Sequence, residues 1–178
     1  MRQISKKITS KIYKYAELGI EDQEMLDMAL EARNKAQAPY SNYFVGVAIK
    51  SDSGRFYWGC NVERASYTQT THAEQNAIDT MVAYEGSSKI SKLALVAGPR
   101  TVSIVLPPMI IGEEIKTLDK VPVPCGHCLQ IIWENCFNDK KVRIIALCGN
   151  GKIAITTIDS AFPIKFGPGD LGIDYSKK

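Results

Sequence analysis

The sequence predicts an α/β protein in which helices cover both faces of a mixed, five-stranded sheet. Segments with apolar residues at helical spacing alternate along the chain with short runs of β-branched and aromatic residues. Two connections between strands, at 51–54 and 149–151, are too short for a crossover and require antiparallel neighbours. The other strands are separated by helices, so the sheet is expected to be mixed.

The first half of the chain supplies a helix, a hairpin and a second helix. Residues 21–37 place methionine, leucine and alanine at helical spacing among acids, and Pro39 ends the run. Residues 44–49 and 55–61 flank a Ser-Asp-Ser-Gly turn and predict a β-hairpin. Residues 75–84 then predict a helix, with the residues just before it in its first turn.

The second half supplies three strands and a third helix. Strands are expected at 93–97, 142–148 and 152–158, and an amphipathic helix at 126–137. The intervening insertion, at about 98–124, contains five prolines together with apolar runs. Loops of this length are usually functional or disordered, and the apolar content argues against disorder. The segment is therefore expected to cover an active site or to form a subunit contact.

Composition indicates an ordinary globular chain with a small-molecule partner. At 178 residues, with 45% hydrophobic and 23% charged residues, residues 1–178 are expected to form a single domain. The net charge of +3 is dispersed, so no nucleic-acid or membrane partner is expected. No segment approaches the roughly 18 apolar residues of a membrane span. The start of the chain lacks a signal peptide's apolar centre, and Cys60, Cys136 and Cys148 are set among apolar residues, so a cytoplasmic location is expected.

Two short motifs supply the ligands of a zinc site. His72 and Glu74 form a His-x-Glu pair, and Cys125 and Cys128 lie three apart, on one face of the first turn of the predicted third helix. Two thiolates and one imidazole suit tetrahedral Zn²⁺ and leave its fourth position open, which is the arrangement of catalytic sites. A redox pair of cysteines is the alternative. His127 would point away from the face that the cysteines share and is expected to be exposed or to lie behind the ligands.

With these residues in place, the chain resembles the cytidine deaminase family over most of its length, from 38–43 to 166–171. The order His-x-Glu followed by Pro-Cys-x-x-Cys is the known signature of zinc deaminases. The most specific segments are Asn-Val-Glu at 61–63, Thr-His-Ala-Glu-Gln at 71–75, Val-Pro-Cys-Gly-His-Cys-Leu-Gln at 123–130 and the tail Phe-Gly-Pro-Gly-Asp-Leu at 166–171.

The resemblance implies a three-layer α/β/α sandwich with a mixed five-stranded sheet. It also implies a hydrolase that acts on the C–N bond of a cyclic amidine, converting cytidine and deoxycytidine to uridine and deoxyuridine plus ammonia in pyrimidine salvage. The cofactor implied is Zn²⁺, held by His72, Cys125 and Cys128, with Glu74 as the catalytic proton shuttle. The alternatives are an enzyme for a nucleotide or an antibiotic nucleoside, and a non-catalytic zinc scaffold.

The resemblance further assigns the residues that bind the nucleoside. Asn61 and Glu63 are implied in sugar recognition, and the backbone at Ala73 and Val123 in contacts with the base. Residues two apart on a strand point the same way, so Asn61 and Glu63 could both reach one ribose, although a solvated strand end has the same pattern. Tyr43 is implied as an aromatic beside the base, with a plain core position as the alternative.

Three features concern assembly. The family resemblance implies sites built at subunit contacts, so a homo-oligomer, dimer or tetramer, is expected, with Phe166 reaching a neighbouring site or, alternatively, serving as a core residue. His72 followed by Gln75 resembles the class whose chains are longer, dimeric and carry a second, inactive domain, which is not expected within these 178 residues. Leu129 occupies a position where the members of the family that the chain resembles commonly have arginine. These departures leave the oligomeric state and the substrate range open.

Overall fold

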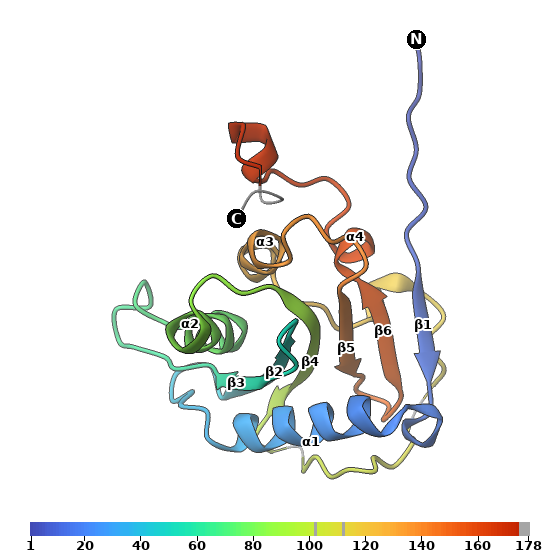
Figure 1. Cartoon of the computed structure of the whole chain (residues 1–178). Coiled ribbons are helices and arrows are strands. Elements are labelled where there is room, and N and C mark those ends of the chain that lie inside the picture. The colour runs from blue at the N-terminus through green and yellow to red at the C-terminus, as the bar shows by residue number, and fades with distance from the viewer. Residues whose placement is uncertain (102, 112, 175–178) are drawn as a thin grey trace.

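A mixed six-stranded sheet lies between two layers of helices, with α1 on one face and α2, α3 and α4 on the other (Figure 1). The structure, a computed structural model, describes residues 1–101, 103–111 and 113–174. The expected α/β/α layering and the mixed sheet are both confirmed. No helix within these residues has the length and apolar character needed to cross a membrane.

The sheet has the strand order β1-β6-β5-β4-β2-β3. Only β4 and β5 pair in parallel, and every other neighbouring pair is antiparallel. The two short connections join β2 to β3 and β5 to β6, as expected. The strands are β1 (Ser10–Tyr13), β2 (Tyr43–Ser51), β3 (Phe56–Cys60), β4 (Ile90–Pro99), β5 (Arg143–Leu147) and β6 (Ile153–Thr157).

The prediction of five strands was wrong by one, because β1 was missed. This strand has only four residues, two of them positioned as Ser10 opposite Thr156 and Tyr13 opposite Ile153 on β6. Its sequence carries lysine and lacks a run of apolar residues. An edge strand of this kind is defined by its pairing with β6, which local sequence does not reveal.

The three expected helices correspond to α1 (Ile20–Asn34), α2 (Ala73–Glu85) and α3 (Gly126–Asn135). A one-turn helix, α4 (Ile158–Ala161), follows β6, and short 3₁₀ turns lie at Tyr15–Glu17, Leu118–Lys120 and Pro168–Leu171. The central strands alternate their side chains between the two faces. Val47 and Ile49 of β2 pack on the side of α2 and α3, whereas Ala48 packs on the side of α1.

Two glycines let the helices lie directly against the hairpin. A Cβ atom at Gly46 would lie 2.0 Å from the carbonyl oxygen of Ala29 in α1, and one at Gly59 would lie 2.4 Å from the backbone nitrogen of Ala77 in α2. Only glycine allows such an approach of backbone to backbone. The contact at Gly59 holds α2 against β3.

Candidate active site

The amino-terminal ends of α2 and α3 meet and bring the predicted metal ligands together. His72 is the N-cap of α2 and Cys125 the N-cap of α3, while Cys128 lies in the first turn of α3. We expected His72 within the first turn of its helix, but its backbone is extended (φ −77°, ψ 152°). His72 therefore precedes the helix, which leaves Glu74 in the first turn.

The three side chains have the spacing of ligands around one ion. His72 Nδ1 lies 3.5 Å from Cys125 Sγ and 3.3 Å from Cys128 Sγ, and the three ligand atoms all lie within 4.8 Å of one another. Ligands at usual zinc bond lengths in a tetrahedron lie about 3.5 Å apart. Two sulfurs and one imidazole nitrogen therefore fit a zinc ion with one position left for another ligand.

The surroundings of the ligands favour a bound cation. Cys128 is fully buried and Glu74 is only 5% exposed. Burial, and then the negative charge of Glu74, raises the pKa of the Cys128 thiol. A divalent ion at the ligands would stabilise the thiolate directly and counteract both effects, as would the positive ends of the two helices.

His127 is exposed, as the sequence analysis expected. Its ring meets that of His72 edge to face, with the centroids 5.4 Å apart. It is not part of the ligand group that the described residues form. His127 therefore packs against the ligand residue His72 without being a ligand itself.

A cavity of about 470 Å³ opens beside the ligands and gathers most of the predicted site residues. Its walls come from the start of β2, the segment after β3, the first turn of α2, the end of β4 and the segment before α3. Cys128 lies behind the cavity wall. The predicted residues that line it are Tyr43, Asn61, Glu63, His72, Ala73, Glu74, Val123 and Cys125.

Asn61 is held in place by the first residues of β2, and Glu63 by the residues just before that strand. Asn61 Oδ1 accepts a hydrogen bond of 2.8 Å from the Val45 N–H, and its Nδ2 donates to the Tyr43 carbonyl at 2.9 Å. The backbone between them pairs with residue 71, directly before His72, through the bridge of Val62 and Thr71. This bridge ties Asn61 and Glu63 to the metal ligands.

The carboxylate of Glu63 accepts hydrogen bonds from the Tyr40 N–H at 2.9 Å, from the Ser41 N–H at 3.2 Å and from the Ser41 hydroxyl. The Ser41 hydroxyl is the main reason that the pKa of Glu63 is lowered, so Glu63 is an anion at neutral pH. Its remaining lone pairs are available to a hydroxyl in the cavity.

Ser41 and Thr70 also line this cavity, although neither was expected at the site. Ser41 lies within the Ala-Pro-Tyr-Ser-Asn-Tyr run that supported the family resemblance, so that run carried the signal. Nothing local marked Thr70, which lies two residues before His72.

Phe166 lies outside the cavity of its own chain. Its side chain is 56% exposed, and its carbonyl accepts a hydrogen bond of 3.1 Å from Gln130 Nε2 of α3. It belongs to the segment after α4, which passes beyond α3 (Figure 1). Within this chain, Phe166 is therefore neither a core residue nor a cavity residue.

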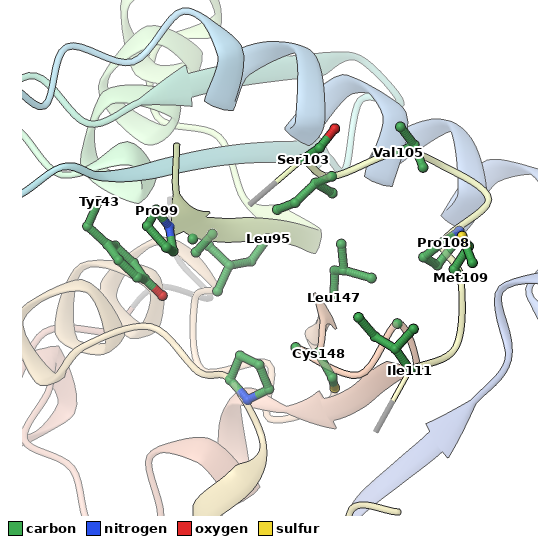
Figure 2. Close-up of a pocket in the computed structure, with 16 residues that line it drawn as sticks. Tyr43, Leu95, Pro99, Ser103, Val105, Pro108, Met109, Ile111, Leu147 and Cys148 are labelled. Atoms are coloured by element: carbon green, nitrogen blue, oxygen red, sulfur yellow. The ribbon is translucent and has the colours of Figure 1, made fainter. Parts of the chain in front are cut away.

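The insertion after β4 contributes to two adjoining cavities. Its end, at Pro122 and Val123, lines the cavity beside the metal ligands, here called the ligand cavity. Its earlier part, residues 103–111, walls a second cavity of about 440 Å³ at the ends of β4 and β5, shown in Figure 2. The walls of both cavities include Tyr43, Leu95, Ala97 and Pro122. The second cavity is mainly apolar, and Leu147 and Cys148 line it from the β5 side (Figure 2).

The fold and the site together define a class of enzyme. A helix-covered mixed sheet, three soft ligands at two helix ends and a buried glutamate beside them are the parts of a zinc-dependent hydrolytic deaminase. Residues 20–146 match the family model described as the cytidine and deoxycytidylate deaminase zinc-binding region. The chain belongs to this family.

Known relatives agree with this assignment. The chain is 33% identical over 150 residues to a cytidine deaminase from Halalkalibacterium halodurans, covering 84% of this chain and 96% of that one. It is 31% identical over 160 residues to a longer cytidine deaminase from Vibrio cholerae, of which it spans 43%. The crystal structure of a cytidine deaminase from Burkholderia pseudomallei superimposes with a TM-score of 0.61 at 26% identity, covering 80% of this chain and 97% of that one.

Proposed function

We propose that this chain catalyses the zinc-dependent hydrolytic deamination of cytidine and deoxycytidine, releasing uridine or deoxyuridine and ammonia. The observation that carries the proposal is the position of Glu74, a buried carboxylate in the wall of a cavity that His72 and Cys125 also line. The volume of about 470 Å³ suits a single nucleoside.

Glu74 is the proton carrier in this proposal. Zinc, when bound by His72, Cys125 and Cys128, supplies a Lewis acid that lowers the pKa of water to about 7. Glu74 takes a proton from the attacking water and gives it to ring nitrogen 3 as carbon 4 becomes tetrahedral. It then takes the proton of the hydroxyl group now bonded to carbon 4 and transfers it to the amine, so that the C–N bond breaks, ammonia leaves and the carbonyl of the product forms.

The other cavity residues orient the nucleoside. Glu63 and Asn61 hydrogen-bond the sugar hydroxyls, and their contacts with Ser41 and β2 fix them before substrate arrives. The N–H of Ala73 has no partner within its helix because it belongs to the first residue of α2, so it is available to the base. The backbone at Val123 faces the base from the other side, and the Tyr43 ring packs beside it.

The proposal also covers the domain organisation, the oligomeric state and the cellular location of the protein. Residues 1–178 form one domain that assembles into a homo-oligomer, dimer or tetramer, and acts in pyrimidine salvage in the cytoplasm. The exposed position of Phe166 supports the assembly, because a large apolar side chain outside its own cavity is free to enter that of a neighbour.

The test is a substrate panel on purified protein with its zinc content measured alongside. Cytidine, deoxycytidine, deoxycytidine monophosphate, a cytosine-containing antibiotic nucleoside and a short single-stranded oligonucleotide are compared by ammonia release. We expect the highest kcat/KM with the free nucleosides. Zinc-loaded protein that releases no ammonia from any of them would identify a non-catalytic scaffold.

A nucleotide substrate is the second candidate, because the matching family includes deoxycytidylate deaminases. Arg64 is exposed next to Glu63 and its guanidinium contacts the Glu63 carbonyl at 3.2 Å. It is therefore placed to meet a phosphate. A higher kcat/KM with the monophosphate, lost in Arg64→Ala, would favour this candidate.

A further inference from the structure

A third cavity, which is mainly polar, lies on the opposite face of the sheet from the cavity beside the metal ligands. It has a volume of about 430 Å³ and is lined by Arg33, Asn34, Phe44, Arg100, Ser103 and Ile104. Phe44 follows Tyr43 on β2, and successive side chains of a strand point to opposite faces. The two cavities are therefore separated by the thickness of the sheet at the start of β2.

Arg33 is an unusually placed cation. Its side chain extends from the last turn of α1, and the residue is only 6% exposed. Its Nη2 donates to the carbonyls of Gly98 at 3.0 Å and Pro99 at 2.8 Å, at the end of β4. Its Nε is buried and has no hydrogen-bond partner within the described residues. The contacts with the end of β4 therefore use only part of the hydrogen-bonding capacity of this guanidinium.

Arg100 brings a second positive charge to the same cavity. Its guanidinium lies 4.4 Å from the centroid of the Phe44 ring, which fixes it at the cavity wall. Within the part of the chain that the structure describes, neither arginine forms an ion pair with a carboxylate. Burial, and then the charge of Arg100, lowers the pKa of Arg33, as expected for two cations with no anion between them.

A buried charge without a counter-charge is unfavourable, and a planar guanidinium matches the oxygens of a phosphate. Asn34 and Ser103, at the same walls, offer further hydrogen bonds. We propose that this cavity binds the phosphate group of a small molecule between Arg33 and Arg100. The source is either free phosphate or a nucleotide, because the volume exceeds that of one phosphate ion. The proposal does not depend on the deaminase reaction.

The experiment measures phosphate binding by calorimetry at low ionic strength. Inorganic phosphate is titrated into the zinc-loaded full chain, and into Arg100→Ala and Arg55→Ala. Arg55 is exposed at the turn between β2 and β3, at the far end of β2, so its removal changes the net charge equally. We expect Arg100→Ala to weaken binding about tenfold, from the loss of a charge-assisted contact, and Arg55→Ala to have little effect.

Arg100→Ala is preferred to an Arg33 variant because Arg33 also supports β4. Phosphate that bound to the zinc instead would be unaffected by Arg100→Ala. Equal affinity in the wild type and Arg100→Ala, or no binding to the wild type, would therefore overturn the proposal. Adenosine monophosphate and adenosine are titrated in parallel. Tighter binding of the monophosphate than of inorganic phosphate, with none of adenosine, identifies a nucleotide, and the reverse order identifies free phosphate.

Discussion

Glu74 is buried beside the thiol of Cys128, so a carboxylate and a predicted metal ligand share a buried space. Two negative groups in such a space repel one another unless a cation lies between them. In the reaction proposed above, the same closeness that makes the pair unfavourable without metal would let Glu74 exchange protons with water at the metal site. Its position thus links zinc binding to proton transfer.

The first prediction concerns Glu74→Gln. This change keeps the shape of the side chain and removes its ability to carry a proton. We expect zinc content to be retained and kcat/KM for cytidine to fall at least ~10²-fold, the low end for general acid–base catalysis. Glu24→Gln, at an exposed position of α1, serves as the control. Near-normal turnover by the Glu74 variant would refute its role.

Among the secondary-structure elements, α2 carries both a metal ligand at its start and the glutamate in its first turn. It is held at two points. Gly59 of β3 allows the backbone of α2 to approach closely. At the other end Glu85 accepts hydrogen bonds from Ser51 at 3.1 Å, Ser53 at 2.7 Å and Tyr57 at 2.8 Å, all from the hairpin of β2 and β3.

Gly59→Ala tests the first of these attachments. The added Cβ would lie 2.4 Å from the Ala77 nitrogen, so α2 must shift away from the sheet. We expect the free energy of unfolding to fall by about 1–3 kcal/mol, as for overpacked cores, and urea denaturation measures it. Gly19→Ala is the matched control, because its Cβ would meet no atom within 4 Å. Equal stability of the two variants would contradict the close approach.

The pH dependence of stability tests all the hydrogen bonds that the Glu85 carboxylate accepts, both those from the hairpin and the one from Ser88. The Ser88 hydroxyl, followed by that of Ser53, lowers the pKa of Glu85 from 4.5 to about 2. A carboxyl whose pKa is lower in the folded state stabilises the fold above its unfolded pKa, and this stabilisation is lost as pH falls toward the folded value. Wild-type stability should therefore fall from about pH 4.5 toward about pH 2.

Glu85→Gln removes this titration, so its stability should depend less steeply on pH over the same window. Asp79→Asn, an exposed acid on the same helix, is the control and should retain the wild-type slope. Urea denaturation at a series of pH values measures the slope. Parallel pH profiles for the wild type and the Glu85 variant would show that its hydrogen bonds contribute no pH dependence.

For the molecule as a whole, large apolar side chains remain exposed both on the insertion after β4 and on the segment after α4. Met109 is 75% exposed, Ile111 59% and Phe166 56%. Exposed apolar patches often mark contacts between proteins. The insertion and the tail that carries Phe166 are thus the parts of the surface best suited to an oligomer.

The prediction at this scale concerns Phe166→Ala. If the side chain enters a neighbour's cavity, its removal should raise KM for cytidine while leaving the thermal stability of the protomer unchanged, because the residue is exposed in its own chain. Ile164→Ala, at a 91% exposed position of the same segment, should change neither. Steady-state kinetics and analytical ultracentrifugation provide the measurements. An unchanged KM in an intact oligomer would refute the role of Phe166.

Much of the fold followed from local pattern. The periodicity at 21–37, 75–84 and 126–137 predicted α1, α2 and α3, and the turns at 51–54 and 149–151 predicted two antiparallel pairs, all of which are confirmed. Strand β1 was missed because four residues with lysine among them form a strand only when β6 is beside them. The start of α2 was misplaced by one residue, because capping depends on backbone angles at His72 that the sequence does not fix.

The sequence by itself determined the kinds of ligand, their order along the chain and the glutamate next to the histidine, because spacing within one or two helical turns fixes which side chains share a face. Only the tertiary structure decided that His72 and Cys125, separated by 53 positions, lie 3.5 Å apart. It alone placed Ser41 against Glu63, left Phe166 outside its own cavity and buried Arg33 with no ion pair to a carboxylate among the described residues. These contacts depend on strand order and helix packing, which are set by the burial of apolar surface over the whole chain rather than by any local motif.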